Sequence, residues 1–385
     1  MSNRDPARGD LPQATPPTPR SAPNWHTAPP CRRPPAEWAS TTDPRVYRRQ
    51  APAYRSSAPW STARTPAATP IAPPPPRERA PGGMALDVLD EQHTDDTIGF
   101  SWRDLIWRIS RGDFGPGKGP AYERELRDRV RAPVGSAFPI AVLNLKGGVG
   151  KTAVVEALGS TFAQVRNDRV VAVDIDGGDL SDRHGRRSRL NMVDLLMDDS
   201  VTRYPDVRAH TYMNSCGLEV LGLPEYAKSN WRVERSDVVK VFSILRKHYS
   251  VVLVDCVKAL ESSAMEAVLP ESQALVVVTS TSIDAIRKTR ITLEWLRNNG
   301  YHTMLATAVL AINHTEPGRP STVAGKELEQ LSADVAATVV LPFDRHVHAG
   351  KEIGLDRLSK ESRRAYLQLA ATLADMFPKR VPKRM

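Results

Sequence analysis

The stretch Phe138-Pro-Ile-Ala-Val-Leu-Asn-Leu-Lys-Gly-Gly-Val-Gly-Lys-Thr152 decides the fold, because it combines an apolar strand, a glycine-rich loop and the start of a helix. Glycines let the backbone N–H groups of such a loop curl around phosphate oxygens, and the positive end of the next helix points at the same charge. A loop that follows a strand and opens a helix is the structural context of a P-loop. The stretch therefore predicts a phosphate-binding site.

The residue types in this loop indicate which ligand it holds. Lys151 is expected to reach the β- and γ-phosphates of a nucleotide, and the Thr152 hydroxyl is expected to ligate Mg²⁺. The residues expected to surround the phosphates are Gly147, Gly148, Val149, Gly150, Lys151 and Thr152. We therefore expect ATP and Mg²⁺ as cofactors.

Strand-like and helix-like segments alternate from Phe138 onward, and several strand candidates are continuous apolar runs, which is typical of parallel strands covered on both faces. The expected strands are Ile140–Leu145, Val170–Asp174, Leu218–Leu223, Val251–Asp255, Ala274–Thr279, Met304–Asn313 and Thr338–Leu341. The expected helices are Ala121–Arg131, Thr152–Gln164, Ser236–Lys247 with Ser236 as its N-cap, Ile283–Asn299 and Val323–Leu331. This alternation predicts an α/β fold with a doubly wound, mostly parallel sheet of about seven strands, which binds its ligand at the carboxyl ends of the strands.

Proline and charge divide the chain unevenly. Twenty of its 32 prolines lie in residues 1–82, together with 12 arginines, no lysine and five acidic residues. Such a Pro/Ala/Arg-rich segment lacks the apolar surface that offsets chain entropy, so we expect a disordered arm, which is either a docking arm or a solubilising tail. The expected domains are this arm at 1–82, a helical linker segment at 83–135 and a P-loop NTPase domain at 136–385.

Residues 99–111 have the pattern of an amphipathic helix. Its apolar residues recur at helical spacing, and they are Trp102, Leu105, Ile106 and Ile109. This apolar face either packs on the main domain or binds a protein partner.

A second lysine precedes the glycines of the P-loop. Lys146 stands directly before Gly147, and Leu145 occupies the position where the general pattern has its first glycine. This is the deviant form of the Walker A loop, and with it the sequence resembles the ParA/MinD family of P-loop ATPases. The resemblance implies an ATP-dependent homodimer in which Lys146 reaches the partner's phosphates and offsets the charge on the transferred phosphoryl group. It therefore implies slow, dimer-dependent ATP hydrolysis.

Further positions resemble the family one at a time. Asp176 matches the aspartate of switch I that positions the attacking water, and Asp255 matches the Walker B aspartate near Mg²⁺. The resemblance thus implies Lys146, Lys151 and Asp176 as catalytic residues, and Thr152 and Asp255 as metal-binding residues. Asn313 and the segment of Pro342, Phe343 and Asp344 match the positions that surround the adenine base.

The segment after Asp255 departs from the family pattern. The family usually has a proline there, whereas this chain has Cys256, Val257 and Lys258. Because this segment is switch II, which links the nucleotide state to partner contacts, hydrolysis could be slow or absent while binding persists. Ala153 also stands where a second threonine is common.

The layout is similar to a narrower group, the actinobacterial MinD-like proteins of the EspI type, which are associated with type VII (ESX) secretion. The resemblance rests on the long arm, the segment Trp102-Arg-Asp-Leu-Ile-Trp-Arg108 and the segment Tyr122–Val130. It implies a secretion-system protein partner, bound through the arm or the Trp102 segment.

Three features bear on where the protein acts. No stretch approaches 18 consecutive apolar residues, so no transmembrane segment is expected. Three cysteines without C-x-x-C spacing suit a reducing cytosol. The apolar face of Ala365–Phe377, with its basic tip, either packs on the domain or lies on an anionic bilayer. We expect a cytoplasmic protein, with a peripheral position at the inner face of the membrane as the alternative.

The leading hypothesis for function is an ATP-dependent dimerisation switch that regulates or positions a secretion complex. One alternative is a ParA-like partition ATPase that binds DNA non-specifically through basic residues such as Arg287, Lys288 and Arg290. The net charge of +9 lies mostly in the arm, which speaks against this alternative. A further alternative is a nucleotide-sensing regulator without useful turnover, which the altered switch II favours.

Overall fold

A mostly parallel β-sheet forms the centre of the structure. The computed structural model describes residues 119–225, 229 and 231–378, so the expected arm at 1–82 and the Trp102 segment lie outside the described residues. Within that range, eight strands form one sheet in the order β3-β4-β2-β5-β1-β6-β7-β8, and only β3 and β4 pair in antiparallel fashion. The strands are β1 (Phe138–Leu143), β2 (Val170–Asp174), β3 (Tyr212–Met213), β4 (Glu219–Leu221), β5 (Val251–Asp255), β6 (Ala274–Ser280), β7 (Val309–Asn313) and β8 (Ala337–Leu341). The domain boundaries at 82 and 135 stay predictions.

The inner strands are covered on both faces. Strands β1, β2, β5, β6 and β7 are buried at every position, which is why their sequences are continuous apolar runs. Strand β1 lies between β5 and β6, and the last residue of β2, Asp174, is in register with the last residue of β5, Asp255. The polar residues that end these strands therefore meet at one edge of the sheet, next to the loop that leaves β1.

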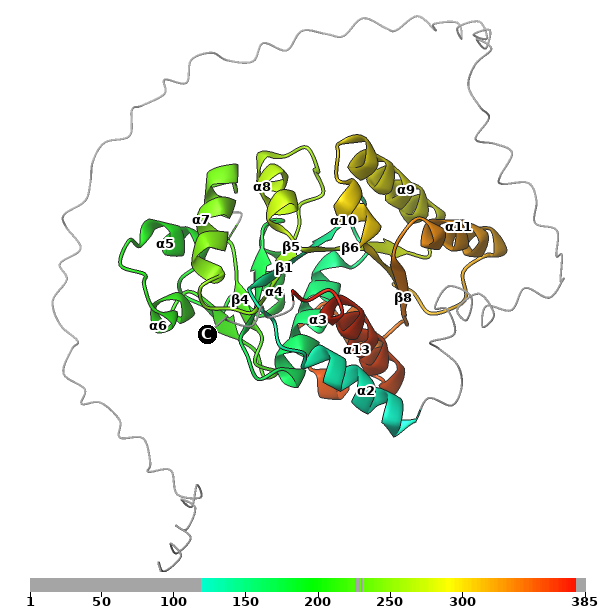
Figure 1. The fold of residues 1–385 in the computed structure, drawn as a ribbon, viewed down its shortest axis with the longest axis horizontal. Coiled ribbons are helices and arrows are strands. Elements are labelled where there is room, and N and C mark those ends of the chain that lie inside the picture. Colours follow the sequence, from blue (N-terminus) through cyan, green and yellow to red (C-terminus); the bar gives the residue numbers. More distant parts are fainter. Residues whose placement is uncertain (1–118, 226–228, 230, 379–385) are drawn as a thin grey trace, which may run out of the picture. The chain divides into compact units, whose positions relative to one another are not determined.

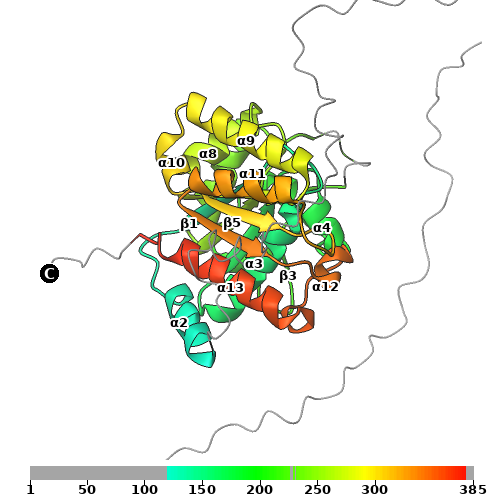
Figure 2. The ribbon, with the colours of Figure 1, turned by 90° about the vertical axis from the view of Figure 1, so that its right-hand side faces the viewer.

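Helices cover the two faces of the sheet in two layers (Figure 1). Helices α7 to α11 lie on one face, and α2, α3 and α13 lie on the other, where α2 packs against α13 (Figure 2). The helices are α2 (Pro120–Val130), α3 (Lys151–Val165), α4 (Asp179–Arg183), α5 (Met192–Met197), α6 (Tyr204–Arg208), α7 (Arg235–Leu245), α8 (Ser263–Glu271), α9 (Ile283–Asn298), α10 (His302–Ala306), α11 (Thr322–Ala333), α12 (Arg345–His348), the 3₁₀ helix η3 (Leu355–Arg357) and α13 (Lys360–Ala374). This arrangement confirms the predicted doubly wound α/β class.

Three local predictions differ from the structure. Strand β3 was not predicted, and it brings the described sheet to eight strands instead of about seven. The segment predicted as a strand over Met304–Asn313 begins inside helix α10, which ends at Ala306, so strand β7 begins only at Val309. The prediction of Ser236 as an N-cap is wrong, because α7 begins one residue earlier. Its N-cap is Glu234, whose N–H donates to the Asp237 carboxylate at 2.9 Å.

The apolar face of α13 is inside the domain. Leu367, Ala370 and Ala371 are at most 4% exposed, and the Phe377 ring lies edge-on to Phe138 with 4.9 Å between ring centroids. Of the two alternatives for this segment, the structure therefore confirms packing on the domain. In the part of the chain that the structure describes, we find no helix with both the length and the apolar character needed to cross a membrane.

Candidate nucleotide-binding site

The loop between β1 and α3 has the backbone shape that its glycines allow. Gly148 and Gly150 have φ angles of +79° and +90°, a left-handed conformation that side chains disfavour. A Cβ at Gly150 would also overlap the side-chain amide of Asn313, which donates to the carbonyl of Val149 at 2.9 Å. Only glycine therefore fits at this position, directly before the first residue of α3.

A buried asparagine anchors the start of the same loop. The Asn144 amide donates to the carbonyl of Val278 at 2.6 Å and to the Thr289 hydroxyl at 2.8 Å, and its oxygen accepts the Lys146 N–H at 2.8 Å. Asn144 is fully buried, so these three bonds fix the loop to β6 and α9. Sequence reasoning assigned no role to Asn144, although a lone polar residue inside an apolar run was a usable signal.

Five of the predicted site residues, two of them glycines of the P-loop, line one pocket. Lys151 and Thr152, at the start of α3, face Asp176 across it, and Lys151 Nζ lies 3.3 Å from Asp176 Oδ2. The pocket is lined by Gly148, Gly150, Lys151, Thr152, Ala153, Asp176, Asp179, Asp182, Arg183, Lys258 and Gly350. Glycine backbone, a buried lysine and the positive end of a 15-residue helix make this pocket suitable for phosphate groups.

Asp255 lies fully buried at the end of β5, near Thr152 and Lys151 of this pocket. Burial, followed by the charge of Asp174, raises the pKa of its carboxyl group, while Thr152 and Lys151 lower it in part. Neither carboxylate oxygen has a hydrogen-bond partner among the residues described. A buried carboxylate without donors is costly unless a cation satisfies it. Because Mg²⁺ typically takes one or two protein oxygens besides nucleotide phosphates, Asp255 and Thr152 fit a magnesium ion here.

Asp174 holds the backbone of the segment that carries Asp176. Its carboxylate accepts the N–H groups of Asp176 at 3.1 Å, Gly178 at 3.2 Å and Leu180 at 2.9 Å. Burial is the main cause that raises the pKa of Asp174, and these three bonds oppose it. Sequence reasoning missed this role. The signal was the same as for Asp255, a carboxylate at the end of a buried strand.

The structure places Lys146 on the outer side of the loop, away from this pocket. Its Nζ lies 2.5 Å from Asp284 Oδ2 in the first turn of α9, and the two side chains are 40% and 59% exposed. Lys146 does not line the pocket that Lys151 and Asp176 share. Its predicted contact with a partner's phosphates stays a prediction.

The residues predicted to surround the base have other contacts in this structure. Asn313 binds the P-loop through Val149, as described above. Asp344 caps α12 by accepting the His346 N–H at 2.9 Å, and it accepts the Ser359 N–H at 2.9 Å ahead of α13. Pro342 and Phe343 are half-buried beside it. Their predicted role in binding the base stays a prediction.

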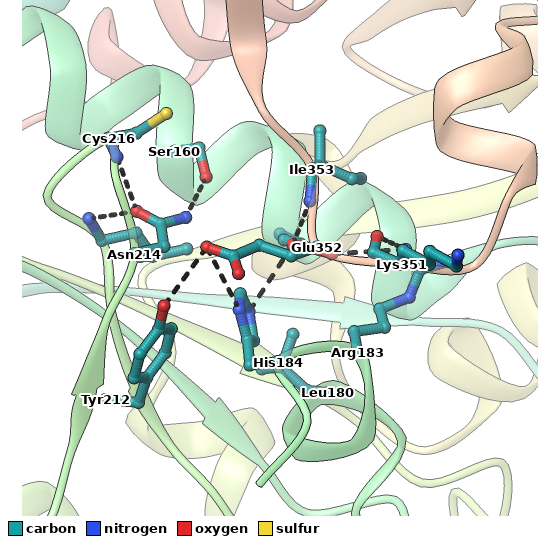
Figure 3. A network of polar contacts seen from close by, with 12 residues as sticks. Ser160, Leu180, Arg183, His184, Tyr212, Asn214, Cys216, Lys351, Glu352 and Ile353 are labelled. Carbon is teal, nitrogen blue, oxygen red and sulfur yellow. Dashed lines mark hydrogen bonds and ion pairs between the residues drawn. The ribbon is translucent and has the colours of Figure 1, made fainter. Parts of the chain in front are cut away.

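Glu156 joins three elements near the pocket, and Figure 3 shows the network that contains its partners Arg183 and Ile353. Glu156 is fully buried one turn after Thr152 on α3, where its carboxylate accepts the Ile353 N–H at 2.6 Å and the Arg183 guanidinium at 3.2 Å. Burial, the largest cause, raises the pKa of Glu156 to about 7. Arg183 also donates to the carbonyl of Lys351 at 3.2 Å, so this network links α3 to two segments that line the pocket.

Comparisons with known proteins agree with this geometry. The family model described as an AAA domain matches residues 138–288. The ESX-1 secretion-associated protein EspI of Mycobacterium tuberculosis is 40% identical over 281 residues, which make up 72% of this chain and 42% of EspI. A candidate MinD septum site-determining protein of Oltmannsiellopsis viridis is 27% identical over 192 residues, which are 48% of this chain and 59% of that protein. The chain thus spans less than half the length of EspI.

The fold has a counterpart among solved structures. The ParA family ATPase from Chlorobium tepidum superposes with a TM-score of 0.52 at 17% identity, and the match covers 61% of this chain and 98% of that one. Together, the fold, the deviant P-loop and these matches make this chain similar to the ParA/MinD-like P-loop ATPases. The chain is also related to EspI of ESX-1 secretion.

Proposed function

We propose that this chain binds ATP with Mg²⁺ and hydrolyses it slowly as an ATP-dependent homodimer, which regulates or positions a partner complex of type VII (ESX) secretion. One observation carries the proposal. Lys151, Thr152 and Asp176, from the P-loop helix and from the segment after β2, line one pocket near the buried carboxylate of Asp255. These are the groups that phosphoryl transfer requires, because it depends mainly on positioning and on charge stabilisation.

Each residue has a role that its position supports. Bound ATP with Mg²⁺ would supply the γ-phosphoryl group and its metal-bridged charge. The Lys151 ammonium would neutralise the β- and γ-phosphates, and the Asp255 and Thr152 oxygens would hold the metal. The Asp176 carboxylate lies 3.3 Å from the Lys151 ammonium. Once Lys151 binds the phosphates instead, Asp176 would be free to orient the attacking water.

The dimer part of the proposal rests on Lys146. Its pairing with Asp284 is largely exposed, and exposed ion pairs contribute only about 0–1 kcal/mol. A phosphate group of a second protomer could therefore displace Asp284 at little cost. A charge-assisted bond to phosphate in a closed interface is stronger than an exposed pair, which favours the exchange.

The partner part rests on the 40% identity to EspI, whose name associates it with ESX-1 secretion. Because this chain spans 42% of EspI, its own secretion partner is a proposal. We place the partner contact on the Pro-rich arm or on the Trp102 segment, which carry the sequence features that a folded P-loop domain does not need.

The testing experiment measures ATP turnover by the full chain and its size in ATP-Mg²⁺ and in ADP, beside Lys146→Ala and Asp176→Ala. We expect dimers in ATP only, and turnover lost in both variants. Lys326→Ala, which removes an exposed lysine of α11, is the control and should behave as the wild type. Tight ATP binding by a monomer without turnover, unaffected by Lys146→Ala, would replace the switch by a nucleotide-sensing regulator.

A further inference from the structure

The side chain of Lys258 lies against the P-loop at Gly147. Lys258 comes three residues after Asp255, in the loop that leaves β5, and it lines the pocket together with Gly148, Lys151 and Asp176. A Cβ placed on Gly147 would be 3.2 Å from Lys258 Cε and 3.5 Å from its Nζ. The absence of a side chain at Gly147 thus leaves room for the lysine to rest on the loop. The Lys258 ammonium is therefore adjacent to the backbone that is expected to bind phosphate.

The other cations of this region are already paired. Lys151 lies beside Asp176, Arg183 beside Glu156, and Lys146 beside Asp284. Lys258 has no hydrogen bond or ion pair within the described part of the chain, and its side chain is exposed to the pocket opening. A free ammonium held against an anion-binding loop is placed to bind the anion itself, since charge-assisted bonds to phosphate are among the strongest in proteins.

The position of Lys258 along the chain indicates which phosphate it reaches. Its loop begins at Asp255, the candidate metal carboxylate, and the metal in P-loop proteins bridges the β- and γ-phosphates. Loops that follow this carboxylate typically change order when the γ-phosphate is lost. In this chain the loop carries Lys258, whose ammonium group can bind the γ-phosphate.

We propose that Lys258 binds the γ-phosphate of ATP within its own protomer, and that this contact makes switch II sensitive to whether ATP or ADP is bound. The inference rests on the proposed function, because it requires the pocket to hold nucleotide. It also gives a role to the unusual sequence after Asp255. Cys256 is buried and Val257 is half-buried, whereas Lys258 is exposed and lines the pocket. Lys146 and Lys258 then have separate tasks, one toward a second protomer and one within the same protomer.

Nucleotide affinity tests this inference directly. The full chain with Mg²⁺ is titrated with ATPγS and with ADP, for the wild type, Lys258→Met, Lys258→Arg and the surface control Lys326→Met. We expect Lys258→Met to weaken ATPγS binding by about 10-fold or more and ADP binding by less than about threefold, because one charge-assisted bond is lost only in the triphosphate complex. Lys258→Arg should restore most of the ATPγS affinity, and Lys326→Met should match the wild type.

The outcomes separate this inference from the proposed function. If the wild type binds both nucleotides and Lys258→Met binds each of them with the same affinity as the wild type, the role of Lys258 is overturned. The proposed nucleotide pocket then still stands. Equal weakening of ATPγS and ADP also overturns it, because Lys258 would then contact the phosphates that both ligands share. A wild type that binds neither nucleotide overturns the proposed function and the role of Lys258 together.

Discussion

On the P-loop side of the pocket, buried amides hold the backbone. Asn144 makes three hydrogen bonds below the loop, and Asn313 makes one to Val149. On the switch side, one carboxylate, Asp174, holds the backbone of residues 176–180, and the side chain of Lys258 has no partner in the described residues. The two sides of one pocket thus differ in the groups that hold them: two amides on the P-loop side, and one carboxylate beside an unpartnered cation on the switch side.

This difference suits a switch. A preformed phosphate loop binds nucleotide without first ordering its own backbone, so little affinity is lost to conformational entropy. A segment that depends on one carboxylate, next to a lysine without a partner, can take two arrangements, and a ligand shifts it only as far as it binds one arrangement more tightly. The P-loop side therefore provides affinity for the nucleotide, and the switch side can report which nucleotide is bound.

The largest expected effect comes from Lys151, on the P-loop side. Its buried ammonium is the cation expected to contact two phosphates, so Lys151→Ala should weaken ATP binding by at least about 100-fold. Equilibrium binding of a fluorescent ATP analogue measures this loss, with Lys326→Ala as the matched surface control. Affinity within about threefold of the wild type would mean that the nucleotide does not bind in this pocket.

The next effect concerns Asn144, the anchor of the P-loop side. Asn144→Ala removes three bonds and leaves the Lys146 N–H, the Val278 carbonyl and the Thr289 hydroxyl without this partner. Since each unmet buried group costs about 1–3 kcal/mol, we expect the free energy of unfolding to fall by about 2–4 kcal/mol. Urea denaturation of the full chain measures it. An unchanged midpoint would show that the loop does not depend on this anchor, and Asn298→Ala, on the exposed end of α9, is the control.

A smaller and more local effect is expected on the switch side. In Asp174→Asn, one carboxylate oxygen becomes an NH₂ group that cannot accept N–H bonds, so residues 176–180 should loosen. We expect turnover to fall by about 10-fold while ATP affinity changes by less than about threefold, because the phosphate loop is untouched. Hydrogen exchange of this segment should quicken. Asp199→Asn, at an exposed loop position, should leave exchange of residues 176–180 unchanged, and wild-type exchange in Asp174→Asn would contradict the role of Asp174.

The sequence predicted most of the fold because the inner strands are buried on both faces. Such strands must be continuous apolar runs, and β1, β2, β5 and β6 were found from that signal alone. Strand β3 was missed because its two residues are too few to show any period. Helix α10 was read as strand because Met304 and Leu305 join an apolar run that continues into β7.

The candidate site was predictable where local order along the chain decides it. Lys151 and Thr152 follow the glycines directly, and Asp255 ends a buried strand whose carboxyl end lies at the edge of the sheet where the ligand was expected. The pairing of Lys146 with Asp284 and the approach of Lys258 to Gly147 join segments far apart in sequence. Because such contacts depend on how α9 and the loop after β5 pack, no spacing rule could show them.

The smallest predicted effect concerns His184, which follows α4 on the switch side of the pocket. This ring is 1% exposed, and its Nε2 lies 3.5 Å from Glu156 Oε1. Burial, opposed by Glu352 and aided by Arg187 and Arg183, lowers the pKa of His184 to about 4. Between that value and an unfolded pKa of about 6.5, only the unfolded chain binds the proton, so the stability from His184 is lost as the pH falls.

Glu156 has the opposite effect on stability over almost the same pH range. Because its pKa is raised to about 7, the folded chain binds a proton that the unfolded chain does not, so stability rises as the pH falls. The two groups therefore oppose each other in the wild type. His184→Phe keeps a ring beside Tyr212 and removes only the histidine contribution, so its stability relative to the wild type should rise by about 1–2 kcal/mol from about pH 7 to about pH 5. Glu156→Gln should change in the opposite sense. Unfolding of both variants at the two pH values measures these changes, and parallel curves for variant and wild type would show that neither group titrates on folding.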